Sequence, residues 1–244
     1  MDSLNKEATI RQILVITDGY SNIGPDPVDA ARRAQKRGIV VNVIGVVDKG
    51  ETGGQGYDEA HSIADAGGGM CRIVQPVDLS ATAQMMTHQT MQLTLQQVVN
   101  QELLSVMGKT AEDLPPAERT RIAQVVEKLE EEVALQLVVA IDMSASMKDK
   151  VDIVREAVRD LALSLQVRTG ALSVAVIAFP GSGDAPTRLV QPFASQVDVR
   201  ALESALQPRG GTPTGPAIDH AVALILEYYQ APVEDEDGPR RDFA

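Results

Sequence analysis

Three oxygen-bearing side chains occupy alternate positions directly after an apolar segment. Residues 137–141 are all aliphatic, and Asp142, Ser144 and Ser146 follow them. Carboxylate and hydroxyl oxygens are hard ligands of the type that a small divalent cation prefers. Taken alone, this segment could equally form a turn or cap a helix, because Asp and Ser readily bond to nearby backbone groups. A cation site therefore requires further ligands from elsewhere in the chain.

Two such ligands follow other predicted elements. Asp18 ends the aliphatic run 13–17, and Thr212 lies in the loop 208–213, directly after two glycines. In open parallel sheets, ligands bind beyond the carboxyl ends of the strands, where the strand order reverses. Two strands that each end in Asp would bring their carboxylates together at that point. Asp18 followed by glycine is by itself typical of a simple turn, so the prediction depends on all five side chains meeting.

Short aliphatic runs alternate with amphipathic segments along most of the chain. We expect strands at 13–17, 39–47, 70–74, 133–141, 172–179 and 187–193, and helices at 28–37, 57–65, 78–107, 117–132, 149–167, 197–206 and 216–229. This alternation predicts an α/β fold with a doubly wound, mostly parallel six-stranded sheet that is buried on both faces. Pro186 and Pro192 favour an edge position for the last strand, which we expect to be antiparallel.

The chain divides into four predicted segments. Residues 1–78 and 133–230 carry the strands, and residues 79–132 form a helical connector between these two halves. The connector is longer than the ~2 to 8 residues that commonly join helices, so we expect it to offer a partner surface. Residues 231–244 are polar and acidic in their first half, which predicts a flexible tail.

The five oxygen donors resemble the metal-ion-dependent adhesion site (MIDAS) of the von Willebrand factor A domain. In that family a DxSxS loop combines with a downstream Thr and a further Asp, and the resemblance covers most of the chain. The family places its DxSxS strand first and its Thr-Asp-Gly strand fourth. Here Thr17-Asp18-Gly19 comes near the amino end and Asp142 follows the connector. The chain thus resembles a circularly permuted member, with strand order 3-2-1-4-5-6 in family terms.

The resemblance implies a role for each matching residue. Ser144, Ser146 and Thr212 would offer hydroxyl oxygens, while Asp142 and Asp18 would bind the ion directly or through water. Mg2+ is the expected ion, with Mn2+ as the alternative, because both accept octahedral oxygen ligation. An open coordination position would accept an Asp or Glu from a protein partner. This is binding without bond chemistry, so the resemblance implies no enzymatic activity.

The permuted order also resembles that of the YabS-like proteins of spore-forming bacteria. That resemblance implies a cytoplasmic role in sporulation, linked to protein phosphorylation and hence to a protein kinase as partner. Cytosolic relatives of this domain often work with AAA ATPases, which implies a second class of partner.

The composition argues against other binding classes. The formal net charge of -12, with no Trp and 3% aromatic residues, opposes binding to nucleic acid or to anionic lipid surfaces. No apolar run is long enough to cross a bilayer. The single cysteine, Cys71, cannot form an internal disulfide, and its apolar neighbours predict a buried small hydrophobe.

Three alternatives remain open on the sequence. The metal site could be vestigial or structural, with the protein acting as a scaffold through its helical connector. Residues 19–24 match the nucleophile-elbow motif Gly-x-Ser-x-Gly except for one extra residue before the second glycine. Ser21 could therefore be the nucleophile of a hydrolase, with His61, His88 or His220 as its base. The long connector would also let two chains exchange halves, giving a homodimer instead of a monomer.

Overall fold

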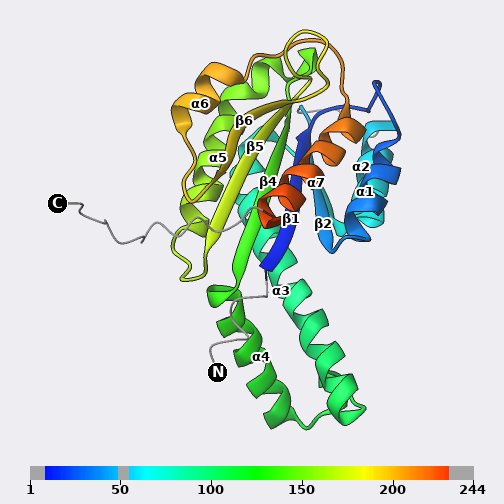
Figure 1. Ribbon diagram of the computed structural model, residues 1–244, viewed down its shortest axis with the longest axis vertical. Coiled ribbons are helices and arrows are strands. Elements are labelled where there is room, and N and C mark those ends of the chain that lie inside the picture. The colour runs from blue at the N-terminus through cyan, green and yellow to red at the C-terminus, as the bar shows by residue number, and fades with distance from the viewer. Residues whose placement is uncertain (1–8, 49–54, 231–244) are drawn as a thin grey trace, which may run out of the picture.

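The computed structural model describes residues 9–48 and 55–230, and a six-stranded sheet forms its centre (Figure 1). The strands are β1 (Thr9–Thr17), β2 (Ile39–Val46), β3 (Gly68–Val74), β4 (Ala134–Asp142), β5 (Leu172–Phe179) and β6 (Arg188–Ala194). Only β6 runs antiparallel to its neighbour; the other adjacent pairs are parallel. The predicted α/β fold and its antiparallel edge are confirmed. The predicted tail, 231–244, lies outside the described residues.

The strand order across the sheet is β3-β2-β1-β4-β5-β6. The chain runs outward from β1 to β3, returns to the centre at β4 and runs outward again to β6. The strand order therefore reverses between β1 and β4, which pair in register with Ile16 opposite Ile141. The carboxyl ends of these two strands lie side by side, at the position where doubly wound sheets bind ligands.

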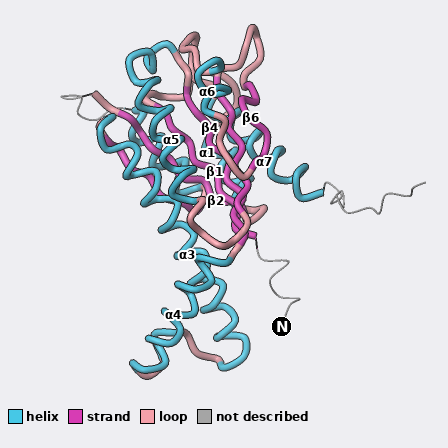
Figure 2. The backbone as a smooth tube through the Cα atoms, turned by 90° about the vertical axis from the view of Figure 1, so that its left-hand side faces the viewer, coloured by secondary structure: helices cyan, strands magenta, loops and turns pink. Residues whose placement is uncertain are grey.

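Helices cover both faces of this sheet (Figures 1 and 2). The α-helices are α1 (Pro27–Gln35), α2 (Gln55–Ala66), α3 (Leu79–Met107), α4 (Pro116–Glu132), α5 (Val151–Leu165), α6 (Val199–Ala205) and α7 (Thr214–Gln230). Short 3-10 helices occur at Pro76–Asp78 (η1), Ala111–Asp113 (η2) and Ala145–Lys150 (η3). One buried cluster joins the sheet to α1, α2 and α7, and a second joins it to α3, α5 and α6.

Side chains of the central strands alternate between these two clusters. In β1, Ile13 and Val15 face α1 and α7, whereas Leu14 and Ile16 face α3 and α5. All four are at most 1% exposed. Each such side chain contributes about 1.5 to 3 kcal/mol when it is buried. Burial on both faces explains why this strand reads as a continuous aliphatic run, as parallel strands in such folds do.

The predicted connector, 79–132, differs from the sequence-based expectation in its first part. Leu79, Ala83, Met86 and Met91 of α3 are buried in the core cluster that includes α5. This part of α3 belongs to the body of the domain, because its apolar side chains cover the sheet. Residues 92–132, the second half of α3, the turn and α4, extend away from the sheet as a helical hairpin (Figures 1 and 2). We call residues 92–132 the arm.

The two helices of the arm contact each other along a single seam. Val126 of α4 is buried, and Val99, Ile122 and Leu129 pack against the same cluster as partly buried side chains. Gly108 ends α3 with φ 66°, a left-handed conformation that glycine adopts without steric cost.

Candidate metal centre

Asp142 ends β4 and is completely buried. Its Oδ1 accepts a hydrogen bond from the backbone N–H of Ser144 at 2.7 Å, and its Oδ2 accepts one from Oγ1 of Thr17 at 2.6 Å. The first bond shapes the turn after β4. The second joins the carboxyl ends of β4 and β1, so the Asp142 carboxylate is fixed at the point where the strand order reverses.

Asp18 and the two serines meet at the same place. Ser146 Oγ donates to Asp18 Oδ1 at 2.7 Å, and the hydroxyl oxygens of Ser144 and Ser146 lie 3.1 Å apart. Asp18 directly follows β1, whereas both serines follow β4. The structure therefore brings together four of the five residues that the sequence predicts as metal ligands.

The loop that carries the fifth residue, Thr212, lies against the other two. Arg209 N–H donates to the carbonyl oxygen of Met143 at 2.7 Å. Thr212 is buried, its N–H donates to Oδ1 of Asn22 at 2.8 Å, and its carbonyl oxygen accepts from the N–H of Asn22 at 3.1 Å. These hydrogen bonds hold the Thr212 loop against both the loop after β4 and the loop after β1.

Lys150 is a buried cation beside the predicted ligands that was not predicted from the sequence. Its Nζ lies 2.8 Å from Asp18 Oδ2 and 3.1 Å from Asp48 Oδ2. Burial acts to lower the pKa of Lys150, but hydrogen bonds to Asp18 and Asp48 outweigh burial and raise the pKa above its ordinary value. A signal was present in the sequence: Lys150 precedes Val154 and Val158 by four and eight residues, on the buried face of the helix. A lysine at such a position is buried only when it is paired.

Thr17 is a second residue of the site that was not predicted from the sequence. Its hydroxyl donates to Asp142 and its Oγ1 also accepts from Gly19 N–H at 3.3 Å. Its position at the end of a strand, directly before Asp18, was the available signal.

Burial dominates the electrostatics of Asp142. It raises the pKa of this carboxyl from 3.8 to about 6, although hydrogen bonds from Thr17 and Ser144 act in the opposite direction. An ionised carboxylate here lacks the solvation it would have in water, which is unfavourable without a nearby cation.

The donor set fits a hard divalent cation. Two carboxylates and two serine hydroxyls are all oxygen ligands, which suits Mg2+ or Mn2+ better than a metal that prefers sulfur or imidazole. Within residues 9–48 and 55–230, no three His, Cys, Asp or Glu side chains gather in an arrangement that could hold a metal. A metal at this position would therefore depend on hydroxyl ligands as well as on Asp142 and Asp18.

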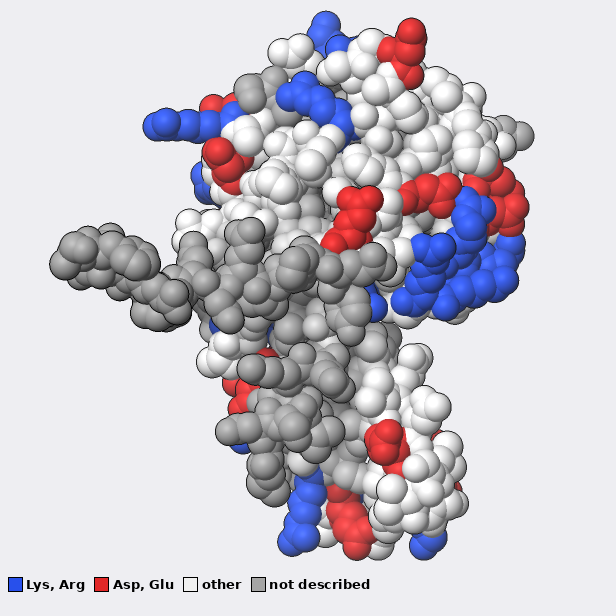
Figure 3. Space-filling view, viewed as in Figure 1, with Lys and Arg blue, Asp and Glu red and all other residues white. Residues whose placement is uncertain are grey.

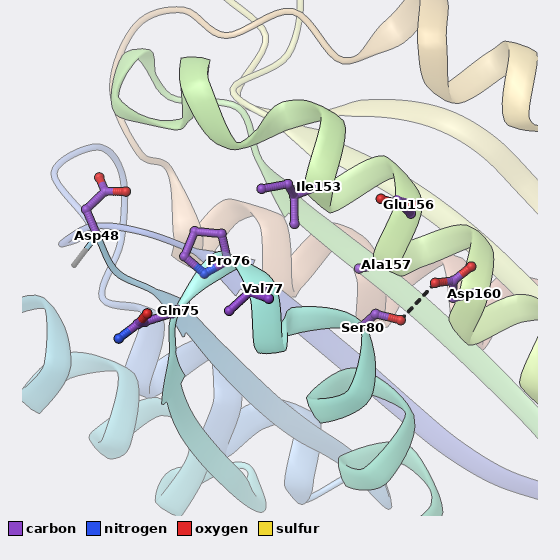
Figure 4. Close-up of a pocket in the computed structure, with 9 residues that line it drawn as sticks. All are labelled: Asp48, Gln75, Pro76, Val77, Ser80, Ile153, Glu156, Ala157 and Asp160. Atoms are coloured by element: carbon purple, nitrogen blue, oxygen red, sulfur yellow. Dashed lines mark hydrogen bonds between the residues drawn. The ribbon is translucent and has the colours of Figure 1, made fainter.

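Asp48 connects the candidate metal centre to a neighbouring pocket of about 550 Å³ (Figure 4). Val77 of η1 and Ile153 of α5 line this pocket, and Ser80 Oγ donates to Asp160 Oδ2 at 3.0 Å across it. Because Asp48 lines the pocket and also contacts Lys150, the two sites share a charged group.

The hydrogen bonds of Ser21, the candidate hydrolase nucleophile, join its loop to the Thr212 loop and to α2. Its hydroxyl donates to the carbonyl oxygen of Thr212 at 3.2 Å, and its N–H donates to Glu59 at 2.7 Å. Nδ1 of His220 lies 2.8 Å from Oγ1 of Thr187. Ser21 thus contributes to holding the Thr212 loop beside the loop after β1.

The fold is a doubly wound α/β domain whose switch point gathers oxygen-bearing side chains from the loops after β1 and β4. The chain belongs to the von Willebrand factor type A domain family, whose model matches residues 2–102. The predicted family is thus confirmed. The predicted circular permutation stays a prediction. Numbering the strands from β4, as a permuted chain requires, gives the order 6-5-4-1-2-3, which is 3-2-1-4-5-6 read from the opposite edge of the sheet. A permuted and an unpermuted chain therefore give the same strand order, and this order does not test the permutation.

Two relatives cover most of the chain. It is 42% identical over 214 residues to the uncharacterized protein YabS of Bacillus subtilis (strain 168), covering 87% of each protein. It is also similar to the crystal structure of an uncharacterized protein from Alicyclobacillus acidocaldarius subsp. acidocaldarius DSM 446. The two chains are 74% identical in sequence and superpose with a TM-score of 0.90, and the match covers 93% of this chain and 98% of the other.

None of the helices within the described residues is both long enough and apolar enough to cross a membrane.

Proposed function

We propose that this domain binds a protein partner through a divalent cation at the switch point of its sheet. The hydrogen bond between Ser146 and Asp18 is the observation that carries the proposal, because it joins ligands that lie 128 residues apart in sequence. The two halves of the predicted ligand set are therefore neighbours. Membership of a family that often mediates metal-dependent protein interactions supports the same function.

Asp142, Ser144, Ser146, Thr212 and Asp18 are the proposed ligands, and Mg2+ is the proposed ion, with Mn2+ as the alternative. When bound, the ion supplies an open coordination position for an Asp or Glu of the partner. The chain's own residues prepare this position. Thr17 and the Ser144 N–H orient Asp142, and Lys150 neutralises Asp18 while no ion is bound.

The surface beside the ligands supplies contacts that a partner can use. Tyr20 and Ile23 lie in the loop that follows β1 and Asp18. Both are about half exposed, and they line a pocket of about 660 Å³. Exposed aromatic and aliphatic side chains next to a polar anchor are typical of interaction sites. We propose that the partner's acidic residue reaches the ion while its neighbouring apolar residues contact Tyr20 and Ile23.

Calorimetric titration with Mg2+ and Mn2+ tests the metal step. We expect the wild type to bind and Asp142→Ala to lose binding, whereas Asp29→Ala, a change at an exposed carboxylate of α1, should bind as the wild type does. Thr212→Ala should weaken binding. Equal titration heats in the wild type and in Asp142→Ala would show that the proposal is wrong.

Affinity capture tests the partner step. We expect the wild type to retain its partner in Mg2+ and to release it in EDTA, and Asp142→Ala to retain none in either buffer. Retention by Asp142→Ala in EDTA would instead assign the interaction to another surface.

A further inference from the structure

The pocket beside Asp48 is a groove between α5 and the turn η1 (Figure 4). Its α5 wall consists of Ile153, Glu156, Ala157 and Asp160, which recur at helical spacing and therefore share one face of the helix. The volume of about 550 Å³ lies within the range of pockets that hold ligands. We call this pocket the η1–α5 groove.

Apolar side chains form the floor and the open side of the η1–α5 groove. Ala157 is buried in the core cluster beneath α5, so it forms the floor. Val77 of η1 is 81% exposed, and Ile153 also reaches the surface. Pro76 begins η1 and fixes the backbone of the turn that presents Val77. A partner that covers these aliphatic side chains removes apolar surface from water, which favours binding.

The charged side chains that line the η1–α5 groove are acidic. Figure 4 shows Asp48 at one end and Asp160 at the other. Among the described residues that line the groove, three are Asp or Glu and none is Lys, Arg or His. Asp160 accepts a hydrogen bond from Ser80, but the nearest guanidinium, that of Arg159, lies 3.7 Å away. Glu156 makes no ion pair within the described chain. The negative charge at the Asp160 end is therefore not balanced.

The main basic patch of the view in Figure 3 lies elsewhere. Lys and Arg side chains gather over α1, where Arg32, Arg33, Lys36 and Arg37 are exposed. This helix packs on the opposite face of the sheet from α5. Helix layers on opposite faces of a sheet are separated by more than the Debye length of about 8 Å, so this patch does not offset the charge of the η1–α5 groove.

One carboxylate of the η1–α5 groove already holds a cation. The ammonium nitrogen of Lys150 lies 3.1 Å from Asp48 Oδ2, and it reaches this carboxylate from the side of the metal centre. The opposite end of the groove offers the same chemistry. Glu156 and Asp160 are one helical turn apart, which places their carboxylates side by side, and two neighbouring carboxylates suit the several N–H donors of a guanidinium or ammonium group.

We propose that the η1–α5 groove binds a Lys or Arg side chain of a protein partner. The cation lies between Glu156 and Asp160. Aliphatic residues beside it in the partner contact Val77 and Ile153. A protein segment fits this groove better than a free polyamine does, because the exposed apolar wall requires aliphatic side chains next to the cation. The groove does not use the divalent ion, so this inference goes beyond the proposed function and does not depend on it.

The peptide acetyl-Trp-Leu-Arg-Leu-amide tests the proposal in EDTA. The chain contains no Trp, so the fluorescence anisotropy of the peptide's indole reports binding as protein is added to about 500 µM. We expect saturable binding to the wild type. Glu156→Gln and Asp160→Asn should each weaken binding about threefold or more, and Val77→Ser should weaken it to a similar degree. Asp29→Asn, the same change of charge on α1, is the control and should bind as the wild type does.

Two further ligands separate the contributions of charge and apolar contact. The peptide acetyl-Trp-Leu-Gln-Leu-amide lacks the cation and should bind about threefold more weakly or less. Spermidine at the same concentration should not displace the Arg peptide. Circular dichroism verifies that each variant is folded.

Three results would overturn the proposal. The first is the absence of saturable binding of the Arg peptide to the wild type. The second is equal affinity for the Gln peptide or for the Glu156→Gln and Asp160→Asn variants, which would leave the carboxylates without a role. The third is displacement of the Arg peptide by spermidine, which would assign the groove to a polyamine.

Discussion

The ammonium group of Lys150 lies 2.8 Å from a carboxylate oxygen of Asp18, and both side chains are almost fully buried, at 7% and 1% exposed. Asp18 is therefore paired with a protein cation on one oxygen and with the Ser146 hydroxyl on the other. Lys150 reduces the cost of burying Asp18. The same positive charge repels any divalent ion that Asp18 would bind.

Replacing Lys150 with Gln should separate these two effects. Without its ammonium group, the buried Asp18 loses its partner, and the metal-free protein should lose about 3 kcal/mol of stability. The affinity for Mg2+ should rise at least tenfold, which corresponds to about 1.4 kcal/mol. Urea unfolding in EDTA and calorimetric titration measure the two quantities. Lys150→Arg keeps the charge and serves as the control. Weaker Mg2+ binding by Lys150→Gln would contradict the prediction and show that Lys150 mainly positions Asp18.

The buried carboxyl of Asp142 predicts a pH dependence of the metal-free protein. Burial raises its pKa from 3.8 to about 6, so the folded state holds this proton more tightly than the unfolded state does. Its contribution to stability is complete below about pH 4 and is lost as the pH rises through 6, a change of about 3 kcal/mol. Asp142→Asn cannot ionise and should be more stable than the wild type at pH 8.

Urea unfolding of both proteins in EDTA, from pH 4 to pH 8, measures this difference. The two stabilities should converge near pH 4, because Asp142 is then protonated in the folded wild type. Saturating Mg2+ at pH 8 should stabilise the wild type alone. A stability difference that does not vary with pH would show that Asp142 titrates normally.

The hydroxyl of Thr17 should contribute most to stability while Asp142 is ionised. Thr17→Val keeps the β-branched shape but removes the 2.6 Å hydrogen bond to the carboxylate. A hydrogen bond to a charged group contributes about 1.5 to 3 kcal/mol, so we expect a loss of this size at pH 8 and a smaller loss at pH 5. Thr17→Ser retains the hydroxyl and should preserve most of the stability. Equal losses at both pH values would argue against this role.

The sequence predicted the fold because hydrophobic periodicity is a local property. The aliphatic runs that end at Thr17 and Asp142 became β1 and β4, and the side chains directly after them meet as expected. The partners of buried polar groups are not local. Asp48, for example, contacts Lys150 across 102 positions of the chain, and no pattern in either segment indicates which residue the other will meet.

Asn42 shows the same limit in the core. It lies in the middle of β2, within an otherwise aliphatic strand, and is fully buried. Its Oδ1 accepts from Met70 N–H at 2.9 Å and from Thr90 Oγ1 at 3.1 Å, and its amide nitrogen lies 3.5 Å from Oε1 of Gln12. The residue thereby connects β2 to β1, β3 and α3, a role that a polar residue in an apolar run does not reveal.

This network predicts a large effect of Asn42→Leu. The substitution leaves the partly buried Met70 N–H and the buried Thr90 hydroxyl without their acceptor, and a buried unpaired group costs about 1 to 3 kcal/mol. We expect a loss of about 3 kcal/mol in urea unfolding. Thr90→Val removes one bond and should lose about 1 kcal/mol. Hydrogen exchange should locate the damage, with faster exchange in β3 and in α3 near Thr90 than in β5. Uniformly faster exchange would contradict a specific attachment of α3 to the sheet through Asn42.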